Sequence, residues 1–291
     1  YICSVFILGG MTSCEDFLDK REDVGLTEDD IFRDYYSLRG FLDQSFNQLE
    51  NVMVMDNWEN GRAFVGLFAD EMATTDNSSA VFTLHSGNWL SNAKSNTTFE
   101  IGNGGSTAIS RSYKALRINN RIINDIDKAP LTPEQKNEIL GQAYFYRSWF
   151  YFQVIKRYGG MPIIDKVFEG GDDDIPRMTY HESHDWMMED IQKAIYMLPD
   201  SWDDPNYGRP TKIAAMALKE WAQLFDASPL MQNDLNSTEN KGYDTERAKS
   251  AAKSAYEVIR YMDGSKSAPY PYGLASKEAV SYTHLTLPTI A

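Results

Sequence analysis

The fold of this chain is decided by residues 131–162, LTPEQKNEILGQAYFYRSWFYFQVIKRYGGMP. Thr132 is the expected N-cap, Pro133 takes the first helical position, and Gln135 completes a capping box. The residues that follow are mostly apolar or aromatic, and the run ends with two basic residues before the glycine pair 159–160 and a proline. Basic residues in the last turn, then glycine, then proline, are the usual end of a helix. The stretch therefore predicts one long helix with a defined start and end.

Helix signals also dominate the sequence on both sides of this stretch. Thr27 with Asp30 makes an N-cap with acid in the first turn, and Thr179 with Glu182 forms a second capping box. Apolar residues follow both starts at helical spacing, and no convincing pair of strands is visible. Further helices are expected within residues 27–49, 110–127, 179–198, 211–228 and 245–264.

Together these segments predict a mostly α protein, built as an array of helical hairpins. Small residues such as Gly141, Ala143 and Ala215 would allow neighbouring helices to pack closely. No repeat period is clean enough to indicate a regular solenoid. Any repeat is therefore degenerate and interrupted by loops.

Composition excludes several functional classes. The chain has 291 residues, of which 42% are hydrophobic, enough for a substantial core in one large domain or two ordinary ones. Its net charge of -14 argues against nucleic-acid binding, which needs clustered Lys and Arg. After Cys14, no apolar stretch approaches the roughly 20 residues of a membrane-spanning helix. Because Cys3 and Cys14 are the only cysteines, a disulfide scaffold and a thiolate-rich metal site are excluded.

Residues 1–13 predict the remnant of a signal peptide. These residues carry no charge. The first of them are mostly apolar and the later ones mostly small, as in the apolar region and cleavage site of a secretory signal. The sequence Met11-Thr12-Ser13-Cys14 matches a bacterial lipobox, in which Cys14 becomes the acylated first residue and residues 14–26 a lipidated tether. Several acyl chains on one cysteine hold a protein stably to a membrane. The alternative is a buried N-terminal strand with a free core cysteine.

Residues 56–105 predict an ordered loop that carries function. Asn, Ser, Thr and Gly accumulate there, interleaved with aromatic residues, for which a flexible linker has no use. Sugars are held by stacking on aromatic rings and by hydrogen bonds from amides and carboxylates, and Trp89, Asn92 and Asp70 supply these groups. The alternative is that the rings pin the loop to the helical body and that Asp70 caps the loop.

No catalytic constellation is recognisable, so neither enzyme activity nor a cofactor is expected. Asp70 and Glu71 are adjacent, and adjacent helical residues point about 100° apart, so this pair does not by itself flank one glycosidic bond. His181 and His184 are expected to be solvated side chains of a first helical turn, because a zinc site needs a third ligand. The sequence therefore predicts no catalytic and no metal-binding residue.

Seven segments, in this order, resemble the SusD/RagB family, the surface nutrient-binding lipoproteins of Bacteroidetes. They are SCEDFLD, LTEDDIF, LFADE, SYKALRINNRIINDID, EILGQAYFYRSWFYFQVIKRYGGMPII, YHESHDWMMEDIQKAIYMLPD and GRPTKIAAMALKEWAQLFDASP. The resemblance covers the chain from Cys14 to about Gly264. The long aromatic helix ending in RYGGMP and the GRPTKIAAMALK segment are specific in combination.

This resemblance implies a fold in which tetratricopeptide-like helix pairs form a scaffold and long loops bind the ligand. It implies a protein that does no chemistry, is tethered to the outer membrane at the cell surface through Cys14, and delivers oligosaccharides to a SusC-like TonB-dependent transporter. The scaffold helices would face the transporter, and Trp89, Asn92 and Asp70 would contact the ligand. The alternatives are a peptide ligand, as in RagB-type members, a helical glycosidase using Asp70 or Glu71, and a scaffold that binds only the transporter.

The expected domain organisation follows from these segments. Residues 27–280 form a SusD-like helical domain, expected to be the N-terminal part of a protein whose C-terminal half is missing. Residues 281–291, SYTHLTLPTIA, differ in composition from the Lys- and Ala-rich helical sequence before them. They resemble translated adapter sequence and are interpreted as a non-native tail.

Overall fold

The computed structural model describes residues 27–49, 108–168, 174–231 and 242–264 of the chain. Within these ranges the chain forms α-helices and short 3-10 turns and no strand. The predicted mostly α fold class is therefore confirmed. No helix within the same ranges combines the length and the apolar character that crossing a bilayer requires.

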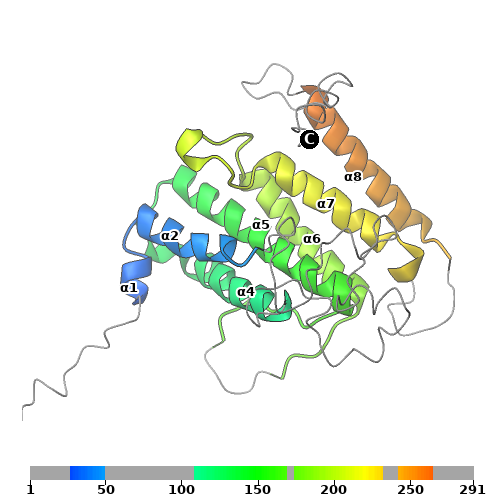
Figure 1. Ribbon diagram of the computed structural model, residues 1–291, viewed down its shortest axis with the longest axis horizontal. Coiled ribbons are helices and arrows are strands. Elements are labelled where there is room, and N and C mark those ends of the chain that lie inside the picture. Colours follow the sequence, from blue (N-terminus) through cyan, green and yellow to red (C-terminus); the bar gives the residue numbers. More distant parts are fainter. Residues whose placement is uncertain (1–26, 50–107, 169–173, 232–241, 265–291) are drawn as a thin grey trace, which may run out of the picture.

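The central helix is α5, Pro133–Tyr158, which lies between α4 and α6 (Figure 1). Thr132 accepts a hydrogen bond from the Gln135 amide, and the Gln135 side chain accepts one from the Thr132 amide, so the predicted capping box is present. At the other end, Gly159 adopts a φ of 76°, which favours glycine. Nearly every side chain from Ile139 to Ile155 is buried. This single helix therefore supplies much of the core.

From α4 onward, each helix packs mainly against its neighbours along the chain. Helix α4, Ala108–Asp125, packs along one side of α5. Helix α6, Tyr180–Met197, packs along another side and contacts α7, Lys212–Asp226. Helix α8, Thr245–Gly264, packs on α7 at the end of the array (Figure 1). The connections contain the 3-10 turns η5, Ile126–Lys128, η6, Asp204–Asn206, and η7, Pro229–Met231.

Residues 27–49 form two helices, whereas their apolar spacing predicts one. Helix α1, Glu28–Ile31, ends after a single turn. Asp34 then starts a second helix, α2, Tyr35–Phe46, by accepting a 2.8 Å hydrogen bond from the Ser37 amide. The single-helix prediction is wrong because an aspartate side chain competes for backbone amides and favours a new N-terminus. Helix α2 packs against α4 and α5.

A buried ion pair joins α5 to α6. Arg147 Nε and Nη2 donate to the two carboxylate oxygens of Asp190 at 2.5 and 2.8 Å, and the two side chains are only 5% and 2% exposed. Arg147 Nη1 donates to the Asn120 side chain on α4 at 3.0 Å. Asn120 in turn donates to the carbonyls of Ile164 and Lys166. One guanidinium therefore connects three helices and the segment that follows α5.

Two glycines allow backbones to approach closely. A Cβ at Gly141 would lie 3.1 Å from atoms of Leu198 and Met197, where the end of α6 meets α5. A Cβ at Gly160 would collide with the backbone of Met178 and Thr179. The prediction that Gly141 permits close helix packing is therefore confirmed.

We expect Asp190→Ala to lower the free energy of unfolding by about 3–5 kcal/mol, because it leaves the Arg147 guanidinium buried without a counter-charge. Urea denaturation followed by circular dichroism measures this loss. Glu189→Ala is the matched control, since Glu189 neighbours Asp190 on the same helix and its side chain is exposed. That control is expected to cost less than about 1 kcal/mol. Equal losses in the two variants would contradict the role given to the buried pair.

Candidate functional site

The residues that the sequence predicts as functional lie outside the described part of the chain. They are the lipidation residue Cys14 and the ligand-binding residues Asp70, Trp89 and Asn92. Their roles therefore stay predictions. The described helices carry a different candidate surface, an open groove on α6, with a polar cluster at its N-terminal end.

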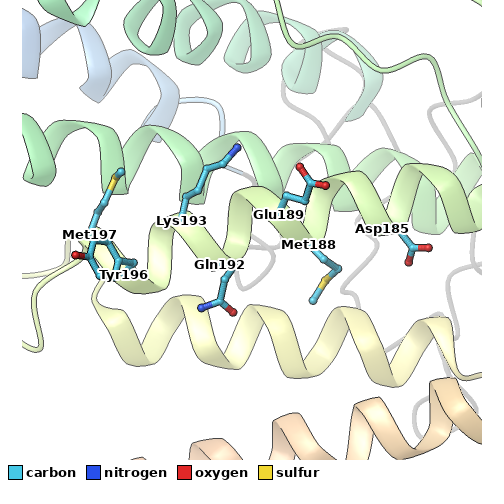
Figure 2. Close-up of a pocket in the computed structure, with 7 residues that line it drawn as sticks. All are labelled: Asp185, Met188, Glu189, Gln192, Lys193, Tyr196 and Met197. Atoms are coloured by element: carbon cyan, nitrogen blue, oxygen red, sulfur yellow. The ribbon is translucent and has the colours of Figure 1, made fainter.

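A groove with a volume of about 660 Å³ runs along α6. Figure 2 shows its lining residues on successive turns of this helix. They are Asp185, Met188, Glu189, Gln192, Lys193, Tyr196 and Met197. Because side chains three or four positions apart share one face of a helix, these residues form one continuous strip about 18 Å long.

The α6 groove combines an exposed ring with adaptable apolar side chains. Tyr196 is 83% exposed, whereas Met188 and Met197 pack partly against the core. Glu189 and Gln192 lie between them and form no ion pair or hydrogen bond with any described residue. Methionine adjusts to irregular surfaces, and tyrosine and methionine are enriched at protein interfaces. The composition of the α6 groove therefore suits contact with another protein.

Lys193 connects the α6 groove to the buried ion pair. Its ammonium lies 3.3 Å from Asp190 Oδ1 and 5.1 Å from the centre of the Tyr144 ring on α5. An ion pair and a cation–π contact together hold the side chain against the body of the protein. The central part of the groove is therefore built on a fixed surface.

The polar cluster at the other end of the groove joins α6, α7 and α8. Asp226, the last residue of α7, accepts hydrogen bonds from Arg247 of α8 at 2.5 Å and from His181 Nδ1 of α6 at 2.9 Å. Arg247 also donates to Asp185, at 3.2 Å. His184 Nδ1 lies 3.0 Å from Asp185, and its Nε2 is buried without a hydrogen-bond partner in the described ranges. This cluster fixes α8 to the rest of the array.

The expectation that both histidines are solvated is wrong for His184, which is only 3% exposed. Asp226 of α7 lies 3.7 Å from His184, and Arg247 of α8 contacts the neighbouring Asp185; the local sequence of α6 does not reveal these contacts. The hydrogen bond from His184, with the Arg247 guanidinium beside it, lowers the pKa of Asp185 to about 2, so Asp185 is a carboxylate at neutral pH. Within the described ranges, no group of three or more His, Cys, Asp and Glu side chains is placed to hold a metal ion.

Sequence reasoning missed the α6 groove. The buried face predicted for residues 179–198 is confirmed, and its members are Met187, Ile191, Ala194 and Leu198. Met188, Tyr196 and Met197 are apolar residues outside this face. Their position beside the buried stripe is the signal that predicts a second contact surface on the same helix.

Comparison with protein families gives a match over most of the chain. A SusD-like family model, described as "Starch-binding associating with outer membrane", matches residues 16–220, which is more than half of the chain. A curated SusD-like protein of Formosa agariphila is 28% identical over 102 residues, which cover 34% of this chain and 20% of that protein.

Solved structures of SusD-like proteins share the fold. A SusD-like protein from Bacteroides fragilis superposes with a TM-score of 0.54 at 23% identity, covering 81% of this chain and 40% of its own. A laminarin-binding SusD-like protein superposes with a TM-score of 0.50 at 16% identity, covering 77% of this chain and 42% of its own. At these identities the likeness shows the fold alone. The chain spans less than half the length of these relatives.

Proposed function

Because this chain belongs to the SusD-like family, we propose that it is a cell-surface protein that captures oligosaccharides and passes them to a SusC-like TonB-dependent transporter. The observation that carries this proposal is the family match over residues 16–220, whose description associates the family with starch binding and the outer membrane. The helical array agrees with the fold of the SusD-like structures. The proposed function is binding and delivery, without a chemical step.

We propose a neutral oligosaccharide as the ligand, contacted by Trp89, Asn92 and Asp70. The family description names starch, and one structural relative is named as binding laminarin. Both are uncharged glucose polymers, and an uncharged ligand is not repelled by a chain with a net charge of -14. An aromatic ring, an amide and a carboxylate together provide the stacking and hydrogen bonding that a sugar requires. A peptide ligand, as in RagB-type proteins, is the alternative.

We expect Trp89→Ala to weaken the affinity for the cognate oligosaccharide at least tenfold, which corresponds to about 1.4 kcal/mol. The physical reason is the loss of the ring on which a sugar face would stack. Calorimetric titration with starch and laminarin oligosaccharides measures the affinity, and the unfolding midpoints of both proteins serve as the control. An unchanged isotherm would assign Trp89 to the packing of its loop.

We propose the α6 groove as a contact surface for the transporter. Its two half-buried methionines and exposed tyrosine have the composition of a protein interface. Glu189 and Gln192 between them have no hydrogen-bond partner among the described residues and are available for hydrogen bonds across such an interface. The polar cluster of Asp185 with Arg247 fixes one end of the groove, so little order has to be gained on binding.

We expect Tyr196→Ala to reduce co-purification of a co-expressed SusC-like transporter about fivefold or more, because an exposed tyrosine at an interface is a frequent hot spot. Quantitative affinity pull-down of the tagged protein from detergent extracts measures this. Tyr243→Ala is the matched control, since Tyr243 is 75% exposed and does not line the groove. Equal recovery with the wild type would refute the groove as the transporter contact.

We expect Cys14→Ala to abolish incorporation of labelled palmitate, because the proposed lipobox makes Cys14 the acylated residue and residues 14–26 the tether. Growth of producing cells with the label, followed by gel analysis, measures the incorporation. Cys3→Ala is the matched control and is expected to keep the label, since Cys3 lies in the proposed signal peptide. Labelling of Cys14→Ala at the wild-type level would show that the anchor lies elsewhere.

A further inference from the structure

A second pocket lies between α2, α5 and the connection from α6 to α7. Its volume is about 270 Å³, and its lining includes residues 205–209 of that connection and Tyr146 of α5. Tyr146 is only 2% exposed, so it forms the base of the pocket. Gly208 has a φ of +94° and open space around its Cβ position, so the turn itself requires glycine. This turn brings Tyr207 and Arg209 to the same pocket.

The base of the pocket is a fixed polar network. Arg209 donates to the two carboxylate oxygens of Asp43 on α2 at 2.7 and 2.9 Å, and to Gln142 Oε1 on α5 at 3.0 Å. The Gln142 amide donates in turn to the backbone carbonyl of Glu138 at 2.9 Å. A bidentate pair of this kind fixes both the position and the orientation of its groups. Burial raises the pKa of Tyr146 beside them, so its hydroxyl stays protonated.

The connection from α6 to α7 is held over the pocket by Asn206. Its Oδ1 accepts hydrogen bonds from Arg39 on α2 at 3.0 Å and from Arg209 Nε at 3.3 Å. Its Nδ2 donates to Asp203 at 2.6 Å. The pocket is therefore formed before any ligand arrives, which lowers the entropic cost of binding.

Two exposed aromatic rings stand at the mouth of this pocket. Tyr207, on the connection from α6 to α7, is 88% exposed, and Phe46, the last residue of α2, is 51% exposed. Asn47 follows Phe46, and its side chain forms no hydrogen bond with any residue of the described ranges. The mouth therefore offers two stacking surfaces and one free amide above a polar base.

We propose that this pocket binds one ring of a neutral oligosaccharide, as a subsite in addition to the contacts proposed for Trp89, Asn92 and Asp70. This inference rests on the proposed function and names a further contact for the same class of ligand. The C–H faces of the sugar stack on Tyr207 and Phe46. Its hydroxyl groups, which are both donors and acceptors, pair with the Asn47 amide and with the outward lone pairs of Asp43.

Charge and volume select this class of ligand. Asp43 and Arg209 neutralise each other within the pocket, so its described lining residues offer no unpaired charge to a phosphate, a sulfate or an ammonium group. A volume of about 270 Å³ lies just below the range of drug-sized ligand pockets, so it holds a ring and not a long segment. The exposed mouth leaves the rest of the oligosaccharide in solvent.

The test is a calorimetric titration of this chain with maltohexaose and with laminarihexaose. We expect Tyr207→Ala to weaken binding about five- to tenfold, because it removes one stacking surface. Tyr207→Phe keeps the ring and is expected to bind like the wild type. Tyr243→Ala removes an equally exposed ring elsewhere, 75% exposed, and is expected to change nothing. Because Tyr207 is almost fully exposed, these variants are expected to keep the wild-type unfolding midpoint.

Trp89→Ala in the same titration separates this inference from the proposed function. If the wild type binds neither hexasaccharide, the proposed function fails and the subsite fails with it. If Trp89→Ala weakens binding while Tyr207→Ala matches the wild type, the proposed function stands and the subsite is refuted. Binding of a peptide that depends on Tyr207, without sugar binding, would also overturn the sugar assignment. Weakening by both variants, with Tyr207→Phe unaffected, supports the subsite.

Discussion

Removing a guanidinium and a carboxylate from water is tolerated only where their hydrogen-bonding groups are satisfied, and the arrangement of this helical array follows from that constraint. Arg147 and Asp190 are both nearly inaccessible and bind each other through two hydrogen bonds. The remaining nitrogen of the guanidinium, Nη1, donates a hydrogen bond to Asn120 on α4. A shift of α5 by one turn, about 5.4 Å, would leave a buried charge unpaired. The pair therefore fixes the register of α4, α5 and α6 against one another.

The register of α6 against α5 also determines which of its residues form the groove. Asp190 faces α5, and the groove residues lie on the flank of α6 beside this contact. Lys193 reaches back to Asp190, which connects the groove to the core. At the N-terminal end of α6, Asp226 is fixed by His181 and by Arg247. The N-terminal end and the middle of α6 are therefore restrained by polar contacts, and the groove along this helix is a rigid surface with adaptable methionine side chains.

The sequence predicts the helices well where local chemistry determines them. The capping boxes at Thr132 and Thr179 place the starts of α5 and α6 correctly, since both partners of each box are three residues apart. Prediction from the sequence fails where a residue's interaction partner is distant in the chain, or where two local signals compete. Asp34 divides the predicted first helix, and the buried His184 meets Asp226 of α7, which lies more than 40 positions later in the chain. The α6 groove follows in part from apolar residues beside the buried stripe. The pocket at Tyr207 does not, because Asp43 and Arg209 are distant in sequence and meet only after folding.

The α6 groove and the pocket at Tyr207 lie on different sides of α5, and this permits a partner and a ligand to bind at the same time. Tyr144 lies under Lys193 of the α6 groove, whereas Tyr146 lines the pocket at Tyr207. Residues two positions apart on an α-helix are related by a rotation of about 200° around the helix axis, so their side chains point in nearly opposite directions. A sugar ring held at Tyr207 and a protein partner held along α6 therefore do not compete for space. For a protein proposed to hold a ligand while it contacts a transporter, this separation is a geometric requirement, and α5 meets it because both tyrosines project from one rigid helix.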